Sequence, residues 1–269
     1  MILINGQIGD SISVLDRGLA YGDGIFRTLR VRNGTPLLWP WQRACLWRDA
    51  VRLGLSAPDE AVLLAEISTV SHAWHEATVK IILTRGVGAR GYAPADTAEG
   101  TRIVQGAAYL APPESCMQDG VQIRLCQLRL AAQPALAGIK HLNRLENVLA
   151  RAEWHDPAIR EGLLQDASGA LIEGTFSNLF LLHAGTLYTP RLDQCGVAGC
   201  VRSWVCEMAQ RVGLVVQEAH VNVEMLYAAD EVFLCNSLIG LWPVVCLEDR
   251  TWLVGSLTRQ FQLLYSYST

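Results

Sequence analysis

The sequence predicts a two-domain protein of mixed α+β and α/β class, with a small N-terminal α/β domain over residues 1–110 and a larger, strand-rich domain over 116–269. Three observations lead to this prediction. The chain has 269 residues, more than one small domain usually holds, and 51% of them are hydrophobic. Strand-like and helix-like patterns alternate along the chain. The consecutive prolines Pro112 and Pro113 stop both patterns and predict a linker over residues 111–115.

The first domain is expected to begin with a run of strands over residues 1–35. Asn5-Gly6 and Asn33-Gly34 within this run are strong signals of two-residue hairpin turns. Pro40 favours the start of a helix, which reaches about Leu53. The other elements expected here are a helix over roughly 59–75 and strands over 78–84 and 102–110.

The second domain is expected to consist mainly of strands, with helices at its periphery. The helices are expected over residues 142–155, 199–212 and 255–266. The strands are expected near residues 121–130, 162–166, 170–173, 177–183, 186–189, 214–218 and 230–236. The sequence contains no internal repeat and no low-complexity segment.

Composition and charge argue against several classes of protein. The net charge is −4 and no run of Lys and Arg occurs, so nucleic acid is not an expected partner. Residues 1–6 lack the basic region of a signal peptide, and the apolar run 238–247 is too short to span a bilayer. None of the eight cysteines forms a Cys-x-x-Cys pair, and most of them lie within apolar runs, as reduced buried thiols do. We therefore expect a cytoplasmic protein without a membrane partner.

Metal and nucleophile patterns are weak. The cysteines at 195, 200 and 206 have no histidine nearby and match no zinc spacing, so no metal is expected. His72 and His75 are expected on a solvated helix face. There is no Gly-x-Ser-x-Gly elbow, and no cysteine stands beside a plausible helper histidine. Paired-carboxylate chemistry stays open, although no pair stands out.

The stretch from Ala137 to Asn147 is the most informative part of the chain. It places Lys140, one of only two lysines, between apolar residues and an expected helix start that carries Arg144. A lysine can hold a carbonyl cofactor as a Schiff base when it is neutral, and burial or a nearby positive charge favours that form. The alternative is an ordinary surface lysine at a helix start.

Two further segments could complete a site of this kind. Glu173 lies at a strand end beside Gly174, where its carboxylate could pair with a protonated heteroaromatic nitrogen or be an exposed turn residue. The segment 196–202 is a glycine-bearing loop that leads into a helix. Backbone N–H groups at a helix start can bind an anion, although this segment has no P-loop spacing.

A third segment, Arg85 to Gly91, contains a formal Gly-x-Gly-x-x-Gly pattern after a strand. A dinucleotide-binding fold needs a helix directly afterwards, and the residues from Tyr92 to Asp96, with Pro94 among them, do not start one cleanly. We therefore expect a mobile loop that carries Arg90 and Tyr92. An arginine with a tyrosine hydroxyl suits a carboxylate, and the alternative is a solvated loop.

Taken together, these motifs resemble the fold-type IV pyridoxal-phosphate enzymes, the family of the D-amino-acid and branched-chain aminotransferases. The stretches that carry the resemblance are 16–28, 85–92, 137–147, 172–180 and 189–196, and they span nearly the whole chain. Within this family, residues 138–146 and 188–194 are most similar to the aminodeoxychorismate lyases. The resemblance implies a homodimer whose larger domain is a strand-rich pseudobarrel, with pyridoxal 5'-phosphate (PLP) between the domains. It also implies elimination from aminodeoxychorismate, giving 4-aminobenzoate and pyruvate in folate biosynthesis.

The resemblance implies a role for each site residue. Lys140 matches the Schiff-base lysine, which also acts as general base, and Glu173 matches the acid that pairs with the pyridine nitrogen. The residues that match phosphate-binding positions are Arg43, Cys200, Val201 and Ser237. The residues on the substrate side are Thr28, which is associated with the lyase activity, Arg90 and Tyr92.

The chain departs from the family pattern in two places. Transaminases often have Gly-Ile-Thr-Arg where this chain has Gly199-Cys200-Val201-Arg202, so phosphate binding must depend more on backbone donors and Ser237. Arg27 stands where other lyases carry a smaller polar residue. A D-amino-acid or branched-chain aminotransferase is therefore an alternative, and a non-catalytic protein that binds PLP or an anion is another.

Overall fold

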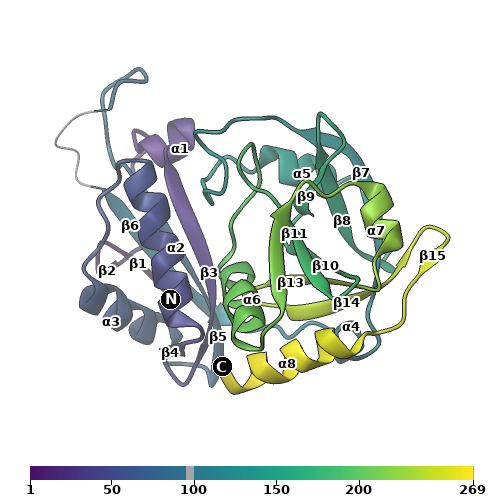
Figure 1. Cartoon of the computed structure of the whole chain (residues 1–269). Coiled ribbons are helices and arrows are strands. Elements are labelled where there is room, and N and C mark those ends of the chain that lie inside the picture. The colour runs from purple at the N-terminus through teal and green to yellow at the C-terminus, as the bar shows by residue number, and fades with distance from the viewer. Residues whose placement is uncertain (95–99, 269) are drawn as a thin grey trace. The chain divides into compact units, whose positions relative to one another are not determined.

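The computed structural model describes residues 1–94 and 100–268, and the chain forms two compact units (Figure 1). Unit 1 comprises Met1–Leu110 together with Ile139–Asn143, and unit 2 comprises Ala111–Gly138 together with Arg144–Thr269. A short segment of five residues that includes Lys140 therefore belongs to unit 1, although the chain on both sides of it belongs to unit 2. The sequence predicted one boundary, at residues 111–115, and did not predict that residues 139–143 would belong to the first unit.

Unit 1 is built on a six-stranded sheet with the order β2-β1-β6-β5-β3-β4, in which all pairs are antiparallel. Its strands are β1 (Ile2–Ile4), β2 (Gln7–Ile8), β3 (Gly24–Arg32), β4 (Thr35–Pro36), β5 (Glu76–Thr84) and β6 (Thr101–Ala108). Both predicted hairpins are confirmed. Asn5-Gly6 joins β1 to β2 and Asn33-Gly34 joins β3 to β4, and all four residues have positive φ angles between 46° and 83°, as such turns require.

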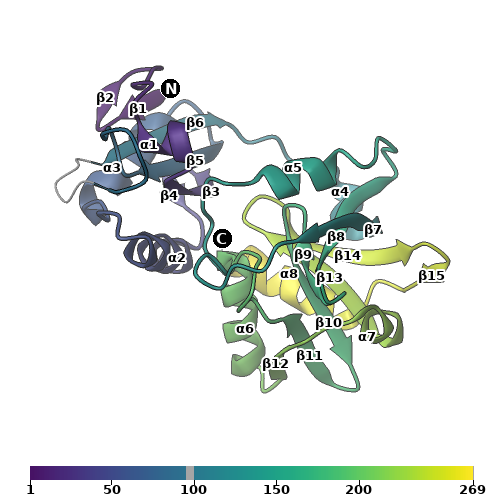
Figure 2. The ribbon, with the colours of Figure 1, turned by 90° about the horizontal axis from the view of Figure 1, so that it is seen from above.

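The helices of unit 1 are α1 (Arg17–Tyr21), α2 (Trp39–Arg52) and α3 (Glu60–Ser71). Side chains of α2 and α3 share one hydrophobic core with the alternate residues of β3, so both helices cover the same face of the sheet (Figure 2). This core includes Leu46 of α2, Ile67 of α3, and Ile25 and Leu29 of β3.

Two expectations for unit 1 were wrong. Residues 1–35 are not strands throughout, because the Asp16 side chain accepts a hydrogen bond from the Gly18 amide and caps the short helix α1. His72 and His75 do not share a helix face, because α3 ends at Ser71. The Ser71 hydroxyl donates to the Ile67 carbonyl within the last turn, and the chain then turns into β5.

Unit 2 is built on a nine-stranded sheet with the path β12-β11-β10-β13-β14-β7-β8-β9, to which β15 adds beside β14. The pairs β11–β12, β14–β7 and β7–β8 are parallel and the others are antiparallel. The strand β9 returns close to β10 and β11, so the sheet curls into a half-barrel. The strands are β7 (Val121–Leu130), β8 (Ile159–Asp166), β9 (Leu171–Gly174), β10 (Asn178–His183), β11 (Thr186–Pro190), β12 (Val215–Ala219), β13 (Glu231–Asn236), β14 (Gly240–Leu247) and β15 (Arg250–Thr251).

The helices of unit 2 lie around this sheet. They are α4 (Glu114–Gln118), α5 (Leu145–Arg151), α6 (Cys200–Arg211), α7 (Val223–Ala228) and α8 (Ser256–Ser268). Helices α6 and α8 meet through an aromatic cluster in which Trp204 contacts Phe261 and Tyr265 edge to face, and Phe261 contacts Phe233 of β13. The mixed α and β class and the strand-rich half-barrel confirm the predicted fold.

Helix α5 is shorter than the expected helix over 142–155. Its first residues are not helical because they pair with β3 instead: the Leu142 amide donates to the Gly24 carbonyl, and His141 forms an antiparallel bridge with Ile25. Helix α4 also begins inside the segment expected to be a linker.

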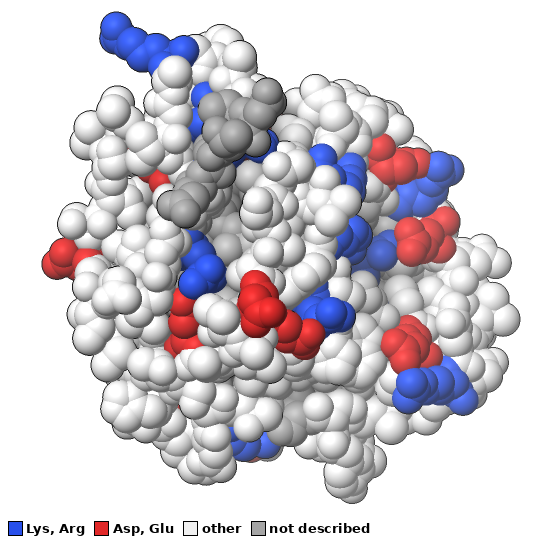
Figure 3. All heavy atoms as spheres, turned by 90° about the vertical axis from the view of Figure 1, so that its left-hand side faces the viewer, with Lys and Arg blue, Asp and Glu red and all other residues white. Residues whose placement is uncertain are grey.

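Several properties of the described residues bear on the function. Within 1–94 and 100–268, no helix is long and apolar enough to cross a membrane. In the same ranges, no group of three His, Cys, Asp or Glu side chains could hold a metal ion. All eight cysteines are free thiols. On the face drawn in Figure 3, positive and negative side chains are intermixed, without an extended patch of one sign.

Candidate active site

Lys140 is fixed to β3 through its main chain. Its carbonyl accepts a 3.0 Å hydrogen bond from the Phe26 amide, and its ammonium nitrogen lies 4.7 Å from the centre of the Phe26 ring. The preceding residue, Ile139, is fully buried in the core of unit 1. Lys140 itself is half-buried, so its side chain is partly shielded and still accessible. Such a setting suits a lysine that must meet a ligand.

Thr28 lies on the same face of β3 as Phe26, two residues further along. Its register partner on β5 is Lys80, the second lysine of the chain, whose ammonium nitrogen lies 5.2 Å from the centre of the same Phe26 ring. The structure therefore brings together both lysines, Phe26 and Thr28. The sequence predicted Lys140 and Thr28 as site residues but not Lys80. Lys80 is found beside them only through the pairing of β3 with β5, which places it opposite Thr28.

Arg27 points to the opposite, helix-covered face of β3, where it is 3% exposed and forms an ion pair with Asp49 of α2. The same Asp49 carboxylate accepts a 3.0 Å hydrogen bond from the Lys140 amide. Arg27 is thus part of the support beneath the lysine. Asp49 was not singled out in the sequence, because nothing in a helical pattern shows which buried carboxylate a distant backbone group will meet.

Glu173 is a buried residue of β9, only 4% exposed. Its Oε2 accepts a 2.8 Å hydrogen bond from the Val197 amide. The adjacent Gly196 has a φ of 83°, and a Cβ there would lie 2.6 Å from Ile172, so only glycine lets the loop approach the glutamate this closely. Burial lowers the pKa of the neighbouring Arg144, although the negative charge of Glu173 acts to raise it.

A second buried carboxylate, Glu161 of β8, holds the turn that follows Glu173. It is fully buried and accepts hydrogen bonds from the amides and hydroxyls of the turn, including Thr175 Oγ1 at 2.6 Å and Ser177 Oγ at 2.7 Å. Burial raises its pKa, and these hydrogen bonds oppose the increase. Sequence analysis missed this residue, because its donors are reached only through the β8–β9 pairing.

The N-terminus of α6 has the features of an anion site. Gly199 is its N-cap and no side chain caps the helix, so the backbone donors of the first turn are not satisfied in that way. The Cys200 thiol lies 3.1 Å from the Ser237 hydroxyl, which brings two predicted phosphate-binding residues to this helix end, where Val201 follows. Asn178 accepts from the Gly199 amide at 3.2 Å, and a Cβ on Gly199 would collide with it.

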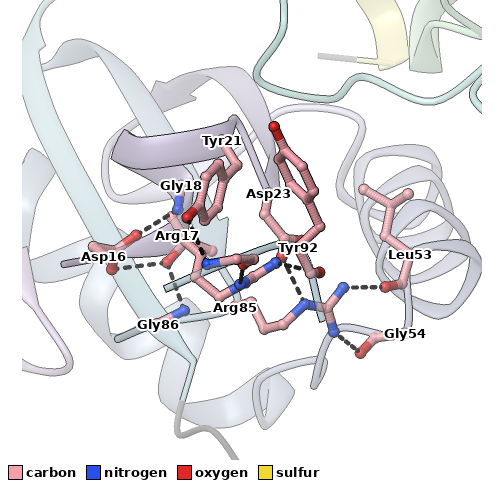
Figure 4. A network of polar contacts seen from close by, with 12 residues as sticks. Asp16, Arg17, Gly18, Tyr21, Asp23, Leu53, Gly54, Arg85, Gly86 and Tyr92 are labelled. Carbon is pink, nitrogen blue, oxygen red and sulfur yellow. Dashed lines mark hydrogen bonds and ion pairs between the residues drawn. The ribbon is translucent and has the colours of Figure 1, made fainter. Parts of the chain in front are cut away.

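The loop after β5 is anchored by a network of charged residues around α1 (Figure 4). The Asp23 carboxylate accepts from Arg17 at 2.9 Å and from Arg85 at 2.8 Å, and Arg17 also donates to the carbonyls of Gly91 and Tyr92. Burial alone would raise the pKa of Asp23, but the two guanidinium groups lower it overall. Arg90 and Tyr92 therefore sit on a loop whose backbone is held in place. Of the residues expected not to start a helix, 95 and 96 lie outside those described.

Arg43 lies on α2 in unit 1, where its Nε donates to Glu60 at 2.7 Å and its guanidinium covers the Trp47 ring. Its side chain is 46% exposed. Its predicted role in phosphate binding stays a prediction. The same holds for the chemical roles of the other predicted site residues.

Comparison with known proteins defines the family. The model of the Amino-transferase class IV family matches residues 24–246, which is most of the chain. The chain belongs to the amino-transferase class IV family. It is 34% identical over 272 residues to the aminodeoxychorismate lyase of Vibrio harveyi, covering 97% of this chain and 98% of the relative. It is 28% identical to a putative branched-chain-amino-acid aminotransferase of Methanocaldococcus jannaschii, covering 97% and 93%.

A solved structure from this class IV family is also similar. The crystal structure of 4-amino-4-deoxychorismate lyase from Pseudomonas aeruginosa has a TM-score of 0.94 and 46% sequence identity, covering 98% of this chain and 97% of that one. The resemblance inferred from the sequence motifs is thereby confirmed for the family and for the fold.

The residues present fit the PLP that the class IV family implies. A helix start without a side-chain cap, with a thiol and a hydroxyl beside it, offers donors for a phosphate group. The loop at Gly196 and Gly199 has no space for a Cβ, which is typical of backbone held close to a ligand or a partner group. Unit 2 also has the buried carboxylate of Glu173, and unit 1 has the half-buried amine of Lys140; each is of the type that the resemblance assigns to the cofactor.

Proposed function

We propose that this protein is a 4-amino-4-deoxychorismate lyase that uses PLP to convert aminodeoxychorismate into 4-aminobenzoate and pyruvate. The observation that carries the proposal is the setting of Lys140, whose main chain is fixed to β3 while its amine lies on the face that carries Thr28. Support comes from the full-length similarity at 46% identity to a solved 4-amino-4-deoxychorismate lyase.

The chemistry that PLP supplies when bound is an electron sink for negative charge at the substrate carbon that bears the amine. Lys140 would hold the cofactor carbonyl through its Nζ. The same Nζ would act as the general base that removes the proton from the substrate carbon. Loss of the enolpyruvyl group on the neighbouring carbon then gives an aromatic product, and aromatisation makes the elimination strongly downhill.

Glu173 would keep a proton on the pyridine nitrogen of bound PLP, because an ionised carboxylate favours the protonated form of a nearby base. The Val197 amide, at 2.8 Å, orients the Glu173 carboxylate. The backbone N–H groups of Cys200 and Val201 and the Ser237 hydroxyl would hold the phosphate, with Arg43 as a further cation.

Thr28, Arg90 and Tyr92 bind the substrate. Thr28 assists proton transfer or orients the leaving group. Arg90 and Tyr92 supply a guanidinium and a hydroxyl for a carboxylate, and their loop is held by Arg17 through the carbonyls of residues 91 and 92.

We further propose that the enzyme is a cytoplasmic homodimer in folate biosynthesis, with a small domain over residues 1–110, a linker over 111–115 and a larger cofactor-binding domain over 116–269. Its eight free thiols fit a reducing compartment. Light scattering of the purified protein at micromolar concentration should give the mass of two chains, and a single-chain mass would contradict the dimer.

The decisive experiment is a product assay. Purified protein incubated with PLP and aminodeoxychorismate should release 4-aminobenzoate and pyruvate in equal amounts. Transfer of amino groups from D-alanine or a branched-chain amino acid to 2-oxoglutarate, without 4-aminobenzoate, would favour the aminotransferase alternative. Borohydride treatment followed by peptide mapping should place the cofactor label on Lys140, and a label on Lys80 would overturn the lysine assignment.

A further inference from the structure

Asp49 collects hydrogen-bond donors from three residues at a fully buried position of α2. Its Oδ1 accepts two hydrogen bonds from Arg48, at 3.0 and 2.8 Å. Its Oδ2 accepts from the buried guanidinium of Arg27 and, at 3.0 Å, from the amide of Lys140. One carboxylate therefore joins helix α2, strand β3 and the segment that carries the lysine.

The Arg27–Asp49 ion pair is not explained by stability. Burying two charges costs several kcal/mol per ion, and replacing such a pair with apolar residues of similar volume is often neutral or stabilising. The geometry of Arg27 is also imperfect, since its Nε is buried without a hydrogen-bond partner. We therefore look for a role of the Arg27–Asp49 ion pair other than stabilising the fold.

The main chain of Lys140 shows that role. On one side of the residue, its carbonyl accepts from Phe26 of β3. On the other side, its amide donates to Asp49 of α2 instead of to a neighbouring strand. Both peptide groups that flank the Cα of Lys140 are thus held, each by a different element. The position and direction of the Cα–Cβ bond, and with it the reach of the amine, are fixed from two sides.

We infer that Asp49, held in place by Arg27, is a positioning residue for Lys140. This inference rests on the proposed function, since it concerns the lysine that binds PLP and moves the proton. Asp49 acts through the Lys140 backbone. Its loss lets the segment 139–143 shift relative to β3, and a misplacement of about 1 Å can slow a reaction by about 100-fold.

The test separates the hydrogen bond from the buried charges. Two double variants, Arg27→Met with Asp49→Asn and Arg27→Met with Asp49→Leu, both lack the ion pair, but only the asparagine retains an oxygen that can accept from the Lys140 amide. The asparagine variant should keep kcat within about threefold of the wild type. The leucine variant should lose about 10- to 100-fold in kcat, with KM changed by less than about threefold.

A readout other than activity accompanies the kinetics. In the PLP-loaded leucine variant, the rate of borohydride fixation on Lys140 and the pH midpoint of the cofactor's visible absorption should both differ from the asparagine variant. Glu66→Gln is the control, because Glu66 is a buried carboxylate of the same unit whose ion pair joins α3 to the half-buried Arg102 of β6. The Glu66→Gln variant should have a lower melting temperature than the wild type. Its rate of borohydride fixation and its absorption midpoint should stay at wild-type values.

Equal fixation rates, absorption midpoints and kcat values in the two double variants would overturn the inference. If the leucine variant does not fold, hydrogen exchange in the wild-type holoenzyme decides: the Lys140 amide should be protected to a degree similar to the Phe26 amide, and exchange at an unprotected rate would overturn it. Failure of the proposed function is distinguishable, because the wild type would then release no 4-aminobenzoate from aminodeoxychorismate, whatever the two double variants do.

Discussion

The Cys200 sulfur lies 3.1 Å from the Ser237 hydroxyl oxygen at the N-terminus of α6. Where related transaminases often have a threonine in this helix start, this chain has Val201, and the neighbouring Cys200 offers a thiol, which is a weaker hydrogen-bond donor than a hydroxyl. The Ser237 hydroxyl is therefore expected to be the principal side-chain donor to an anion at this place.

Replacing Ser237 with Ala should weaken PLP binding about tenfold, because hydrogen bonds to charged groups contribute about 1.5–3 kcal/mol. Val201→Thr, which restores the family hydroxyl, should recover part of the loss in the Ser237→Ala background. The measurement is equilibrium dialysis of the apoprotein with PLP. Cys206→Ala on the same helix serves as control. Unchanged affinity in Ser237→Ala would remove Ser237 from the phosphate site.

Replacing Glu173 with Gln should leave PLP bound and Lys140 labelled by borohydride, yet lower kcat by about 100-fold or more, because a neutral amide no longer favours the protonated pyridine nitrogen. The assay is steady-state release of 4-aminobenzoate. The exposed Glu207 of α6, changed to Gln, is the control and should have wild-type kinetics. Near-normal turnover in the Glu173 variant would exclude the proposed role.

Replacing Glu161 with Gln should lower the free energy of unfolding by about 3 kcal/mol, since the amide NH2 would face the N–H and O–H donors of residues 175–177 without an acceptor. Urea unfolding monitored by tryptophan fluorescence measures the change. Glu218 pairs with Arg202, but its own side chain is 56% exposed, so Glu218→Gln should cost less than about 1 kcal/mol. Similar midpoints for the two variants would contradict a special role for Glu161.

Asp23 should contribute to acid sensitivity. Its pKa is lowered in the folded state relative to its ordinary value of 3.8, so its stabilising contribution is complete above about pH 3.8 and is lost as the pH falls through the lowered pKa. Asp23→Asn should therefore be less stable than the wild type at pH 7, and the difference should shrink at lower pH. Urea midpoints at pH 7 and at about pH 3 test this.

The exposed Asp10, changed to Asn, is the control for this titration and should follow the wild type at both pH values. A stability difference between Asp23→Asn and the wild type that stays constant down to about pH 2 would show that the Asp23 carboxylate does not exchange its proton with folding.

Secondary-structure elements that depend on neighbouring residues alone could be predicted from the sequence with nearly correct bounds. The hairpins at Asn5-Gly6 and Asn33-Gly34 depend on turn residues alone, and the long helices and strands show their own periodicity. Helix α1 was missed because five residues are too short for a periodic pattern. Strand β14 was missed because Pro243 argues against a strand; it is tolerated there because pairing with β7 begins only at Val244.

The candidate site divides in the same way. Lys140, Glu173 and the start of α6 carry chemistry in their residue types and in the turns around them, so a single sequence could identify them. Lys80, Asp49 and Glu161 could not be identified, because each acquires its partners through pairing or packing between segments far apart in the chain.

The sequence by itself therefore determined the fold class, the family and the residue types of the proposed chemistry, since these depend on local patterns and on motif order. Only the tertiary structure decided what holds Lys140. Its carbonyl is bound by Phe26 and its amide by Asp49, which lies 91 positions earlier in the chain. Backbone groups carry no residue-specific signal, so the partner of a buried N–H group is known only when the chain is folded.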